Sequence, residues 1–277
     1  MPLTVQPIPD EPALLVHNTI DTLVIADLHI GIERELYRSG ISIPSQTRKV
    51  LDRILKLVTN HSPDRIVLVG DVKHNIPYIS WQEQRELPML LAAISRNMPV
   101  DIAPGNHDGG IDKYTRENAT LHASGGFVLD GVGYVHGHAW AHPDVLNAKY
   151  MIMAHNHPNI RFIDDLGYQS SESAWIRTTL RRDDPAFTDR YRNLGSADPQ
   201  VIIMPAFNDL CGGVPFNASD PDLLGPIAVH ALEIDCATAY LLDGTNLGRI
   251  GDMVQNHESA QQLRSRSMRL MQKTLLV

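Results

Sequence analysis

The chain has 277 residues, 43% of them hydrophobic, and a formal net charge of −8. This length and apolar content suffice for a buried core within one large domain. The acidic balance argues against a broad, strongly basic nucleic-acid surface, although it leaves room for a local one. The sequence contains no long apolar run and no signal-peptide pattern, so we expect a cytoplasmic protein without membrane contact. The two cysteines, Cys211 and Cys236, are too few for a disulfide framework, and we expect both to be small buried apolar residues.

The first half of the chain alternates short apolar segments with segments of helical spacing. The run at 65–69 is continuously apolar after its first residue, which is typical of a strand buried on both faces. This alternation predicts a parallel sheet with right-handed crossovers, whose functional site lies beyond the carboxyl ends of the strands. We expect strands at 13–16, 22–25, 65–69 and 99–103, and helices at 45–59 and 82–95, the second containing Pro88.

The second half predicts another sheet packed against the first. The stretch 164–199 is polar and irregular, and we interpret it as an insertion or a long loop. Asp243-Gly244 is a plausible turn, and 257–277 is expected to be a helix. Together these segments predict a single α/β domain over residues 1–277. Further strands are expected at 127–129, 133–135, 150–153, 201–204, 227–234 and 238–242.

Short polar clusters follow the expected strand ends. They supply Asp, Asn and His side chains but no Cys, a set that can hold two adjacent divalent ions through nitrogen and oxygen atoms. Two neighbouring ions are a common device for attacking a phosphate ester. The clusters are Asp27-Leu28-His29, Gly70-Asp71, Gly105-Asn106-His107-Asp108, His136-Gly137-His138 and His155-Asn156-His157.

The first two clusters suggest separate roles for their members. Asp27 and His29 lie two residues apart, so along a strand both would face one ion. Asp71 is a candidate bridge, because a carboxylate has two oxygens; the alternative is an Asp that caps the next helix. His74 either reaches the same pocket or lies at the surface.

The third cluster combines a ligand with an acid. Asn106 offers a neutral carbonyl oxygen to a metal, which leaves His107 free to act as an acid. Asp108 could orient His107 or raise its pKa, and Gly105 allows a tight bend. The two His-x-His pairs that follow, at 136–138 and 155–157, lie too close together to be read as isolated surface histidines.

This order of motifs resembles the calcineurin-like metallophosphoesterase superfamily, and within it the archaeal SbcD-related (ICC-like) phosphoesterase group. The sequence segments that resemble this group include 26–33, 70–74 and 205–213. The resemblance implies two mixed β-sheets packed as a sandwich flanked by helices, with two metals at one sheet edge. The family's His precedes the Gly, which favours His136 over His138, and Ala154 stands where the family usually has Gly. The resemblance assigns Asp27, His29 and His157 to one metal, Asn106, His136 and His155 to the other, Asp71 as bridge, and His107 as acid with Asp108 in support.

These residues predict a metal-dependent phosphoesterase, and the resemblance to the SbcD-related group implies that it hydrolyses phosphodiester bonds in nucleic acid or nucleotides. A hydroxide bridging the two ions would attack phosphorus, and His107 would protonate the leaving oxygen. Mn²⁺ is the expected metal, with Fe, Zn or Ni as alternatives. The alternative activities are a small-molecule phosphomonoesterase and a cyclic-nucleotide phosphodiesterase. A non-catalytic scaffold is less favoured, because the acid and all seven expected ligands are present.

The expected partner is a phosphate-ester substrate, with DNA or RNA as one candidate, and the sequence does not indicate an oligomeric state. Arginines interleaved with aromatic residues between 161 and 192 could form a surface for phosphates and stacked bases. The acids in the same stretch match those arginines in number, so a charge-balanced surface is the alternative. The candidate contact residues are Arg161, Arg177, Arg181, Arg182, Arg190, Arg192, Tyr168, Trp175 and Tyr191.

Overall fold

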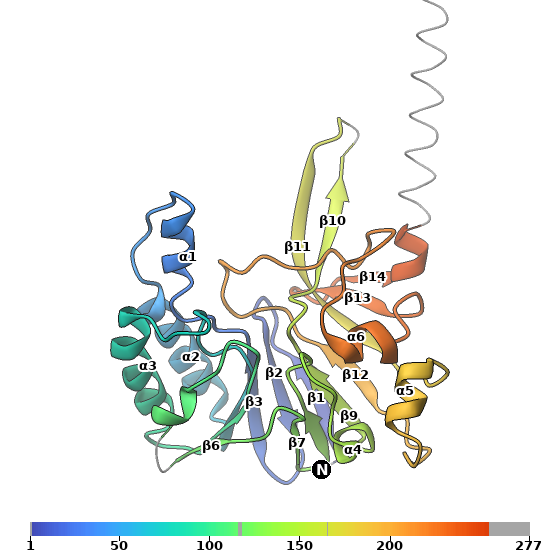
Figure 1. Cartoon of the computed structure of the whole chain (residues 1–277), viewed down its shortest axis with the longest axis horizontal. Helices are drawn as coiled ribbons and strands as arrows, with labels where there is room; N and C mark the ends of the chain where they lie inside the picture. Colours follow the sequence, from blue (N-terminus) through green and yellow to red (C-terminus); the bar gives the residue numbers. More distant parts are fainter. Residues whose placement is uncertain (1, 116–117, 165, 255–277) are drawn as a thin grey trace, which may run out of the picture.

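Two mixed β-sheets stack face to face, with helices on their outer sides (Figure 1), as expected for the fold class. The computed structural model describes residues 2–115, 118–164 and 166–254. Sheet 1 has the order β1-β2-β3-β4-β5-β6, with β3 to β6 parallel. Its strands are β1 (Thr4–Pro7), β2 (Ala13–His17), β3 (Asp21–Ala26), β4 (Arg65–Val69), β5 (Val100–Ala103) and β6 (Ala119–Leu121), and its helices are α1 (Glu33–Arg38), α2 (Thr47–His61) and α3 (Trp81–Ile94).

Sheet 2 has the order β14-β13-β11-β12-β9-β8-β7, and β10 pairs with β11. Within it, β8, β9 and β12 run parallel, and the other pairs are antiparallel. Its strands are β7 (Phe127–Leu129), β8 (Val132–Tyr134), β9 (Tyr150–Met153), β10 (Asn159–Ile163), β11 (Gln169–Thr178), β12 (Gln200–Ile203), β13 (Thr238–Leu241) and β14 (Asn246–Arg249), and its helices are α4 (Pro143–Leu146), α5 (Pro185–Arg190) and α6 (Gly225–Ala231).

Three hydrophobic cores hold these layers together. The core between the sheets includes Val67 and Val69 from sheet 1 and Ile152 and Ile202 from sheet 2. A second core packs sheet 1 against α2 and α3, and a third packs sheet 2 against α4, α5 and α6. Ala154 is fully buried in the core between the sheets, so the methyl group that replaces the family's usual Gly is accommodated there.

Most expected strands and helices lie within about two residues of the observed ones, but the strand expected at 227–234 is wrong. Helix α6 occupies Gly225–Ala231, with Pro226 in its first turn, where a fixed φ favours helix entry. Ile227, Ala228 and Ala231 then face the core. That short apolar run fits a helical face as well as a strand, which periodicity alone cannot separate.

The loop expected at 164–199 also differs from the structure. Ten of its residues form β11, which pairs with both β12 and β13 inside sheet 2. The polar half, 169–173, is exposed because it continues beyond the sheet as a hairpin with β10, and Ala174, Trp175 and Ile176 are buried. Residues 185–190 form α5. The helix expected at 257–277 lies outside the described residues.

Across 2–115, 118–164 and 166–254, no helix has the length and apolar character needed to cross a membrane. The cytoplasmic location stays a prediction.

Candidate metal centre

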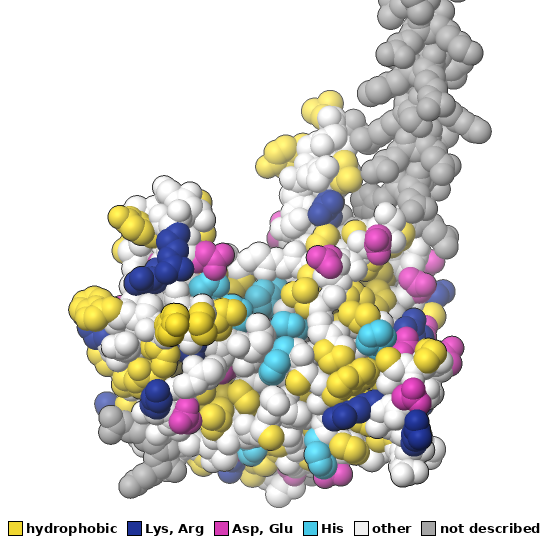
Figure 2. Space-filling view, viewed as in Figure 1, with side chains coloured by type: hydrophobic (Ala, Val, Ile, Leu, Met, Phe, Trp, Pro, Cys, Tyr) yellow, Lys and Arg dark blue, Asp and Glu magenta, His cyan; other side chains and the backbone are white. Residues whose placement is uncertain are grey.

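The polar clusters converge at one edge of the sandwich. Asp27 follows β3, Asp71 follows β4, and His107 follows β5, and these parallel strands end at the same edge. His136 and His155 follow the parallel strands β8 and β9 of the facing sheet. Histidines gather in the hollow between the projecting α1 region and the β10–β11 hairpin (Figure 2).

Five of the expected ligands have a positive φ, which is uncommon for residues with a Cβ atom. These angles differ from the strand geometry expected for Asp27 and His29, because β3 ends at Ala26. Strain of this kind persists only where the surrounding structure imposes it, and it clusters at functional sites. The five are Asp27 (54°), His29 (42°), Asp71 (46°), His155 (71°) and His157 (43°).

Asp27 is completely buried, and neither of its carboxylate oxygens has a hydrogen-bond partner among the described residues. Its nearest ion-pairing atoms are His157 Nε2 at 3.5 Å and His136 Nδ1 at 3.6 Å from Oδ1. A buried carboxylate that accepts no hydrogen bond is costly unless a cation compensates its charge. Asp27 therefore has the surroundings of a metal ligand rather than of a structural acid.

Asp71 lies between two groups of potential ligands. It belongs to the group Asp27, His29 and Asp71 and to the group Asp71, His136 and His155, in each of which the ligand atoms lie within 4.8 Å of one another. Its Oδ2 is 3.6 Å from His29 Nε2 and 3.3 Å from His136 Nε2. One carboxylate thus faces two sets of ligands, which is the geometry that a bridge between two ions requires.

The histidines of these groups turn nitrogen atoms toward the shared centre. His136 donates from Nδ1 to the Val69 carbonyl at 3.1 Å, and its Nε2 lies 3.1 Å from His155 Nδ1. His157 donates from Nδ1 to the Gly212 carbonyl at 2.8 Å, which leaves Nε2 3.3 Å from His29 Nε2. Such backbone acceptors fix the tautomer of a metal-binding imidazole.

The pKa values reflect burial beside two carboxylates. Burial lowers the pKa of His29 to about 3 and that of His155 to about 4, which favours the neutral form that binds metals. Burial opposes charge on His136 as well, but its hydrogen bond to Asp71 and the charges of Asp71 and Asp27 raise its pKa to about 9. The centre therefore favours a positive charge at this position, which a divalent ion would also supply.

Two glycines allow the clusters to approach one another. A Cβ atom on Gly70, which has a φ of 77°, would lie 2.1 Å from His136 Nδ1. A Cβ on Gly105 would lie 2.0 Å from Asp71 Oδ1. Gly105 is thus needed for space beside Asp71, whereas the sequence suggested a tight bend.

The loop after β5 holds its residues differently from our expectation. Asn106 is exposed, and it is flanked by Gly105 and by His107, whose backbone N–H donates to Asp71 Oδ1 at 2.9 Å. The His107 ring donates from Nδ1 to the His74 carbonyl rather than to Asp108. Asp108 accepts from the backbone N–H groups of Gly105 (2.8 Å) and Lys73 (3.2 Å), and burial raises its pKa to about 6. Asp108 therefore holds the loop in place through these backbone hydrogen bonds, and it is linked to His107 only by the peptide bond between them.

His74, which the sequence left undecided, lies in the site. Its Nδ1 is 3.1 Å from His29 Nδ1, and its Nε2 is 2.5 Å from Glu35 Oε2 on α1. It also belongs to a further group of potential ligands with His29 and His107. The contact with Glu35 could not be foreseen, because no pattern in the sequence marked the first helix.

Two further residues border the site. Cys211 is half-buried and forms a potential ligand group with His29 and His157. Cys236 is exposed. The expectation that both cysteines are buried apolar residues is therefore wrong. Burial raises the pKa of the Cys211 thiol. The His138 ring lies tilted against that of His136, at 5.4 Å between ring centroids and 52° between their planes, and its buried Nδ1 lacks a hydrogen-bond partner in the described structure.

The arginine-rich stretch does not form the expected surface as a whole. Trp175 and Tyr191 are buried in the cores. Arg181 pairs with Asp184 at 3.2 Å, and Arg192 pairs with Asp189 at 3.1 Å, as the charge-balanced alternative predicted. Tyr168, on the β10–β11 hairpin, remains exposed.

An α/β sandwich with Asp and His side chains at the carboxyl ends of its strands is the arrangement of a metallophosphoesterase, a hydrolase class that acts on phosphoric esters. The chain belongs to the calcineurin-like phosphoesterase family, whose model matches residues 20–207. This family uses divalent metals. The donor set described above fits such ions, since it combines unpaired carboxylate oxygens with imidazole nitrogens.

Among curated proteins, the chain is similar to the serine/threonine-protein phosphatase CPPED1 of Mus musculus, with 35% identity over 66 residues. That alignment covers 23% of this chain and 20% of the relative, so the chain matches about a fifth of that protein's length. Among solved structures, it is similar to the nuclease MPE of Pseudomonas putida (TM-score 0.48, 16% identity, 88% of this chain and 100% of that one). It is also similar to the phosphoesterase YfcE of E. coli (TM-score 0.38, 13% identity, 82% and 97%).

Proposed function

We propose that the protein is a two-metal phosphodiesterase that acts on nucleic acid or nucleotides. The observation that carries this proposal is the position of Asp71, which is shared by two groups of potential ligand atoms beside the buried Asp27 carboxylate, whose oxygens accept no hydrogen bond in the described structure. Asp27, His29 and His157 would hold one ion, and Asn106, His136 and His155 the other. Two divalent ions held there would activate water for attack on phosphorus and offset the negative charge that develops on the phosphoryl oxygens.

His107 is the proposed general acid. Its Nδ1–H donates to the His74 carbonyl, which leaves Nε2 to carry the proton that the leaving oxygen needs. The His107 ring is half-buried, and its centroid is 5.0 Å from that of His29. A substrate bound at the candidate metal ligands would therefore lie close to His107. Asp108 supports this role indirectly, by holding the loop through Gly105 and Lys73.

A diester substrate is favoured by the shape of the surface around the site. The hollow that contains the histidines is flanked by the α1 region and by the β10–β11 hairpin (Figure 2). Tyr37 on α1 and Tyr168 on the hairpin are 69% and 73% exposed, and exposed aromatic rings can stack on bases. A monoesterase remains the second candidate, and a small substrate would make no use of these rings. The assignment to the SbcD-related group stays a prediction.

The experiment compares two model substrates on metal-stripped protein to which Mn²⁺ has been returned. We expect faster hydrolysis of bis-p-nitrophenyl phosphate than of p-nitrophenyl phosphate, and parallel assays with Fe²⁺, Zn²⁺ and Ni²⁺ would rank the metals. Preference for the monoester would move the function to a phosphatase. If neither ester is cleaved with any of these metals, the result would favour the alternative of a non-catalytic scaffold on this fold.

Replacing His107 by Ala should lower turnover of the diester by about 10²–10⁴-fold, the usual contribution of general acid catalysis. Metal content, measured by mass spectrometry of the dialysed protein, should stay at two ions, because His107 is not a proposed ligand. His61→Ala at the exposed end of α2 is the matched control. Unchanged turnover in His107→Ala would remove this residue from the mechanism.

A further inference from the structure

The side chain of Cys211 lies against two of the candidate ligands. Its sulfur and one ring nitrogen each from His29 and His157 form a group of atoms that all lie within 4.8 Å of one another. The Nε2 atoms of the two histidines are 3.3 Å apart. One thiol and two imidazoles at such distances form a donor set that proteins use to bind thiophilic divalent ions such as Zn²⁺.

A second observation at the same place points to a cation. Asp27 is completely buried, and its Oδ1 lies 3.5 Å from His157 Nε2. Neither of its carboxylate oxygens accepts a hydrogen bond in the described part of the chain. Because a buried carboxylate of this kind is costly unless a cation compensates its charge, the position next to Cys211 calls for a positive ion.

The loop that follows β12 fixes Cys211 in this place. Asn208 Nδ2 donates to the Leu28 carbonyl at 2.8 Å, which ties the loop to the segment that carries the first two candidate ligands. The backbone N–H of Cys211 donates to the Asn208 carbonyl at 3.0 Å. On the other side, the Gly212 carbonyl accepts from His157 Nδ1 at 2.8 Å. Hydrogen bonds on both sides of Cys211 therefore hold it beside the two imidazoles.

We propose that the Cys211 thiolate is a further ligand of the first ion, the one assigned to Asp27, His29 and His157. This inference rests on the proposed two-metal centre and adds a difference between its two positions. A thiolate ligand favours a thiophilic ion such as Zn²⁺ over Mn²⁺ at the first position. The second position has only oxygen and nitrogen donors, which suit Mn²⁺ as well. The centre would then hold a thiophilic ion beside a harder one.

The state of the thiol depends on the ion. Burial, together with the charges of Asp27 and Asp71, raises the pKa of the free Cys211 thiol, so without metal the side chain is neutral. A divalent ion reverses this preference, because it offsets both carboxylates and deprotonates a thiol that coordinates it. The proton passes to the solvent as the sulfur–metal bond forms.

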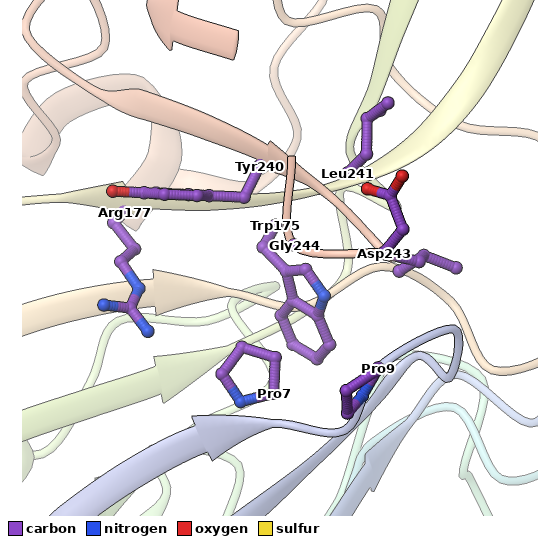
Figure 3. A pocket seen from close by; sticks show the side chains of 9 residues that line it. Pro7, Pro9, Trp175, Arg177, Tyr240, Leu241, Asp243 and Gly244 are labelled. Carbon is purple, nitrogen blue, oxygen red and sulfur yellow. The ribbon is translucent and has the colours of Figure 1, made fainter. Parts of the chain in front are cut away.

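Cys236 offers a matched control within the same chain. It is exposed, and its sulfur accepts from Arg249 Nη2 at 3.5 Å. It lines a surface pocket together with Arg177, and this arginine also borders the pocket of Trp175 and Tyr240 (Figure 3). None of the described residues that line these two pockets is a histidine, so neither pocket offers Cys236 an imidazole with which to share an ion.

The test is absorption spectroscopy of the metal-stripped full-length protein during titration with Co²⁺, which binds to the same kinds of ligand as Zn²⁺. A sulfur–cobalt bond gives a charge-transfer band in the near ultraviolet that oxygen and nitrogen ligands do not give. We expect this band in the unchanged protein and in Cys236→Ser, and its loss in Cys211→Ser. Mass spectrometry of the dialysed samples would count the bound ions.

Competition between Zn²⁺ and Mn²⁺ measures the proposed selectivity. Losing a group that only orients a ligand costs about 10–100-fold in metal affinity, so losing a direct ligand should lower Zn²⁺ affinity at least that much in Cys211→Ser. The affinity for Mn²⁺ should fall less, because Mn²⁺ binds thiolates weakly. Equal losses for the two metals, or no loss for Zn²⁺, would contradict the proposal.

Thiol labelling provides a measurement that needs no variant. Zn²⁺ should slow the reaction of Cys211 with an alkylating reagent, followed by peptide mass spectrometry, and should leave the rate at Cys236 unchanged. Equal rates at Cys211 with and without Zn²⁺ would overturn the proposal even if Cys211→Ser failed to fold. A protein that binds two Co²⁺ ions without the charge-transfer band would remove Cys211 from the centre and leave the two-metal proposal standing. A protein that binds no Co²⁺ would overturn both.

Discussion

At the scale of single residues, the candidate ligands are held by contacts that leave their nitrogen and oxygen atoms facing inward. His29 is the clearest case, because both of its ring nitrogens have defined neighbours. Its Nε2 faces Asp71 and His157, and its Nδ1 lies 3.1 Å from His74 Nδ1. Glu35 lies 2.5 Å from the other nitrogen of His74. The Glu35 carboxylate, the imidazoles of His74 and His29, and the candidate ligand groups therefore form one row. A protonated His74 Nε2 would leave its Nδ1 to accept from His29, which fixes the His29 tautomer.

We therefore predict that His74→Ala lowers metal affinity by about 10–100-fold, the usual effect of losing a group that orients a ligand histidine. His74→Asn should restore part of this affinity, because its amide oxygen can accept the same hydrogen bond. Calorimetry with Mn²⁺ would measure affinity and stoichiometry together. A stoichiometry of one ion instead of two would show that His74 is a ligand itself.

Glu35→Gln provides a second check of the same row. It should weaken metal binding less than His74→Ala, and the double variant should be no worse than His74→Ala alone, because Glu35 acts through His74. Glu172→Gln, on the exposed part of β11, is the control. Additive losses in the double variant would contradict the arrangement.

At the scale of elements, helix α3 is tied to the site through its first turn. Ser80 caps the helix, and Glu83 completes the capping box. The Oε1 atom of Glu83 also accepts from the backbone N–H groups of His74 (3.0 Å) and Asn75 (2.7 Å). The carboxylate is fully buried, so one side chain joins the start of α3 to the segment that carries His74.

Replacing Glu83 by Gln should destabilise the protein by about 1–3 kcal/mol, because an amide NH₂ would then face N–H groups that need an acceptor. Urea unfolding followed by circular dichroism would measure this change. Ser80→Ala removes only the other half of the box and should cost about 1 kcal/mol. A Glu83→Gln variant as stable as the unchanged protein would mean that the buried network contributes little.

At the scale of the whole molecule, two sheets bring together residues that are up to 130 positions apart, from Asp27 to His157. The folded chain places buried carboxylates and five strained backbone positions at this edge. Strained residues cost of order 1–3 kcal/mol each, which the rest of the fold must offset. Ions that bind only the folded state would therefore raise its stability by mass action.

We predict that Mn²⁺ raises the melting temperature of the metal-stripped protein, and that a chelator reverses the shift. Free metal at 100 times its Kd corresponds to about 2.7 kcal/mol for one site. Asp27→Asn keeps the size of the side chain and removes a buried carboxylate that accepts no hydrogen bond in the described structure, so without metal it should melt no lower than the unchanged protein. It should also lose most of the Mn²⁺-dependent shift in a calorimetric scan. An equal shift in both proteins would place the metal elsewhere.

Much of the site was predictable from local patterns. The strands before Asp27, Asp71, His107, His136 and His155 are apolar runs that end abruptly at polar side chains, and both features are local. The parallel order of β3, β4 and β5 followed from their alternation with helices. The strand expected at 227–234 was wrong because α6 is too short for its periodicity to be distinguished from that of a strand. The segment 169–178 was not predicted as a strand because its first half pairs with β10 beyond the sandwich and stays exposed, so it carries no apolar pattern.

The sequence by itself determined the chemical types of the candidate ligands, their order and the family, since these depend on residues close together along the chain. Only the tertiary structure decided which atoms face one another: Asp71 between two groups, the His107 ring on the His74 carbonyl, and Cys211 beside His157. The same holds for Glu35, which reaches His74 from a helix 39 residues away. Such contacts depend on how two sheets and a helix pack, and packing is set by the whole set of buried side chains rather than by any local pattern.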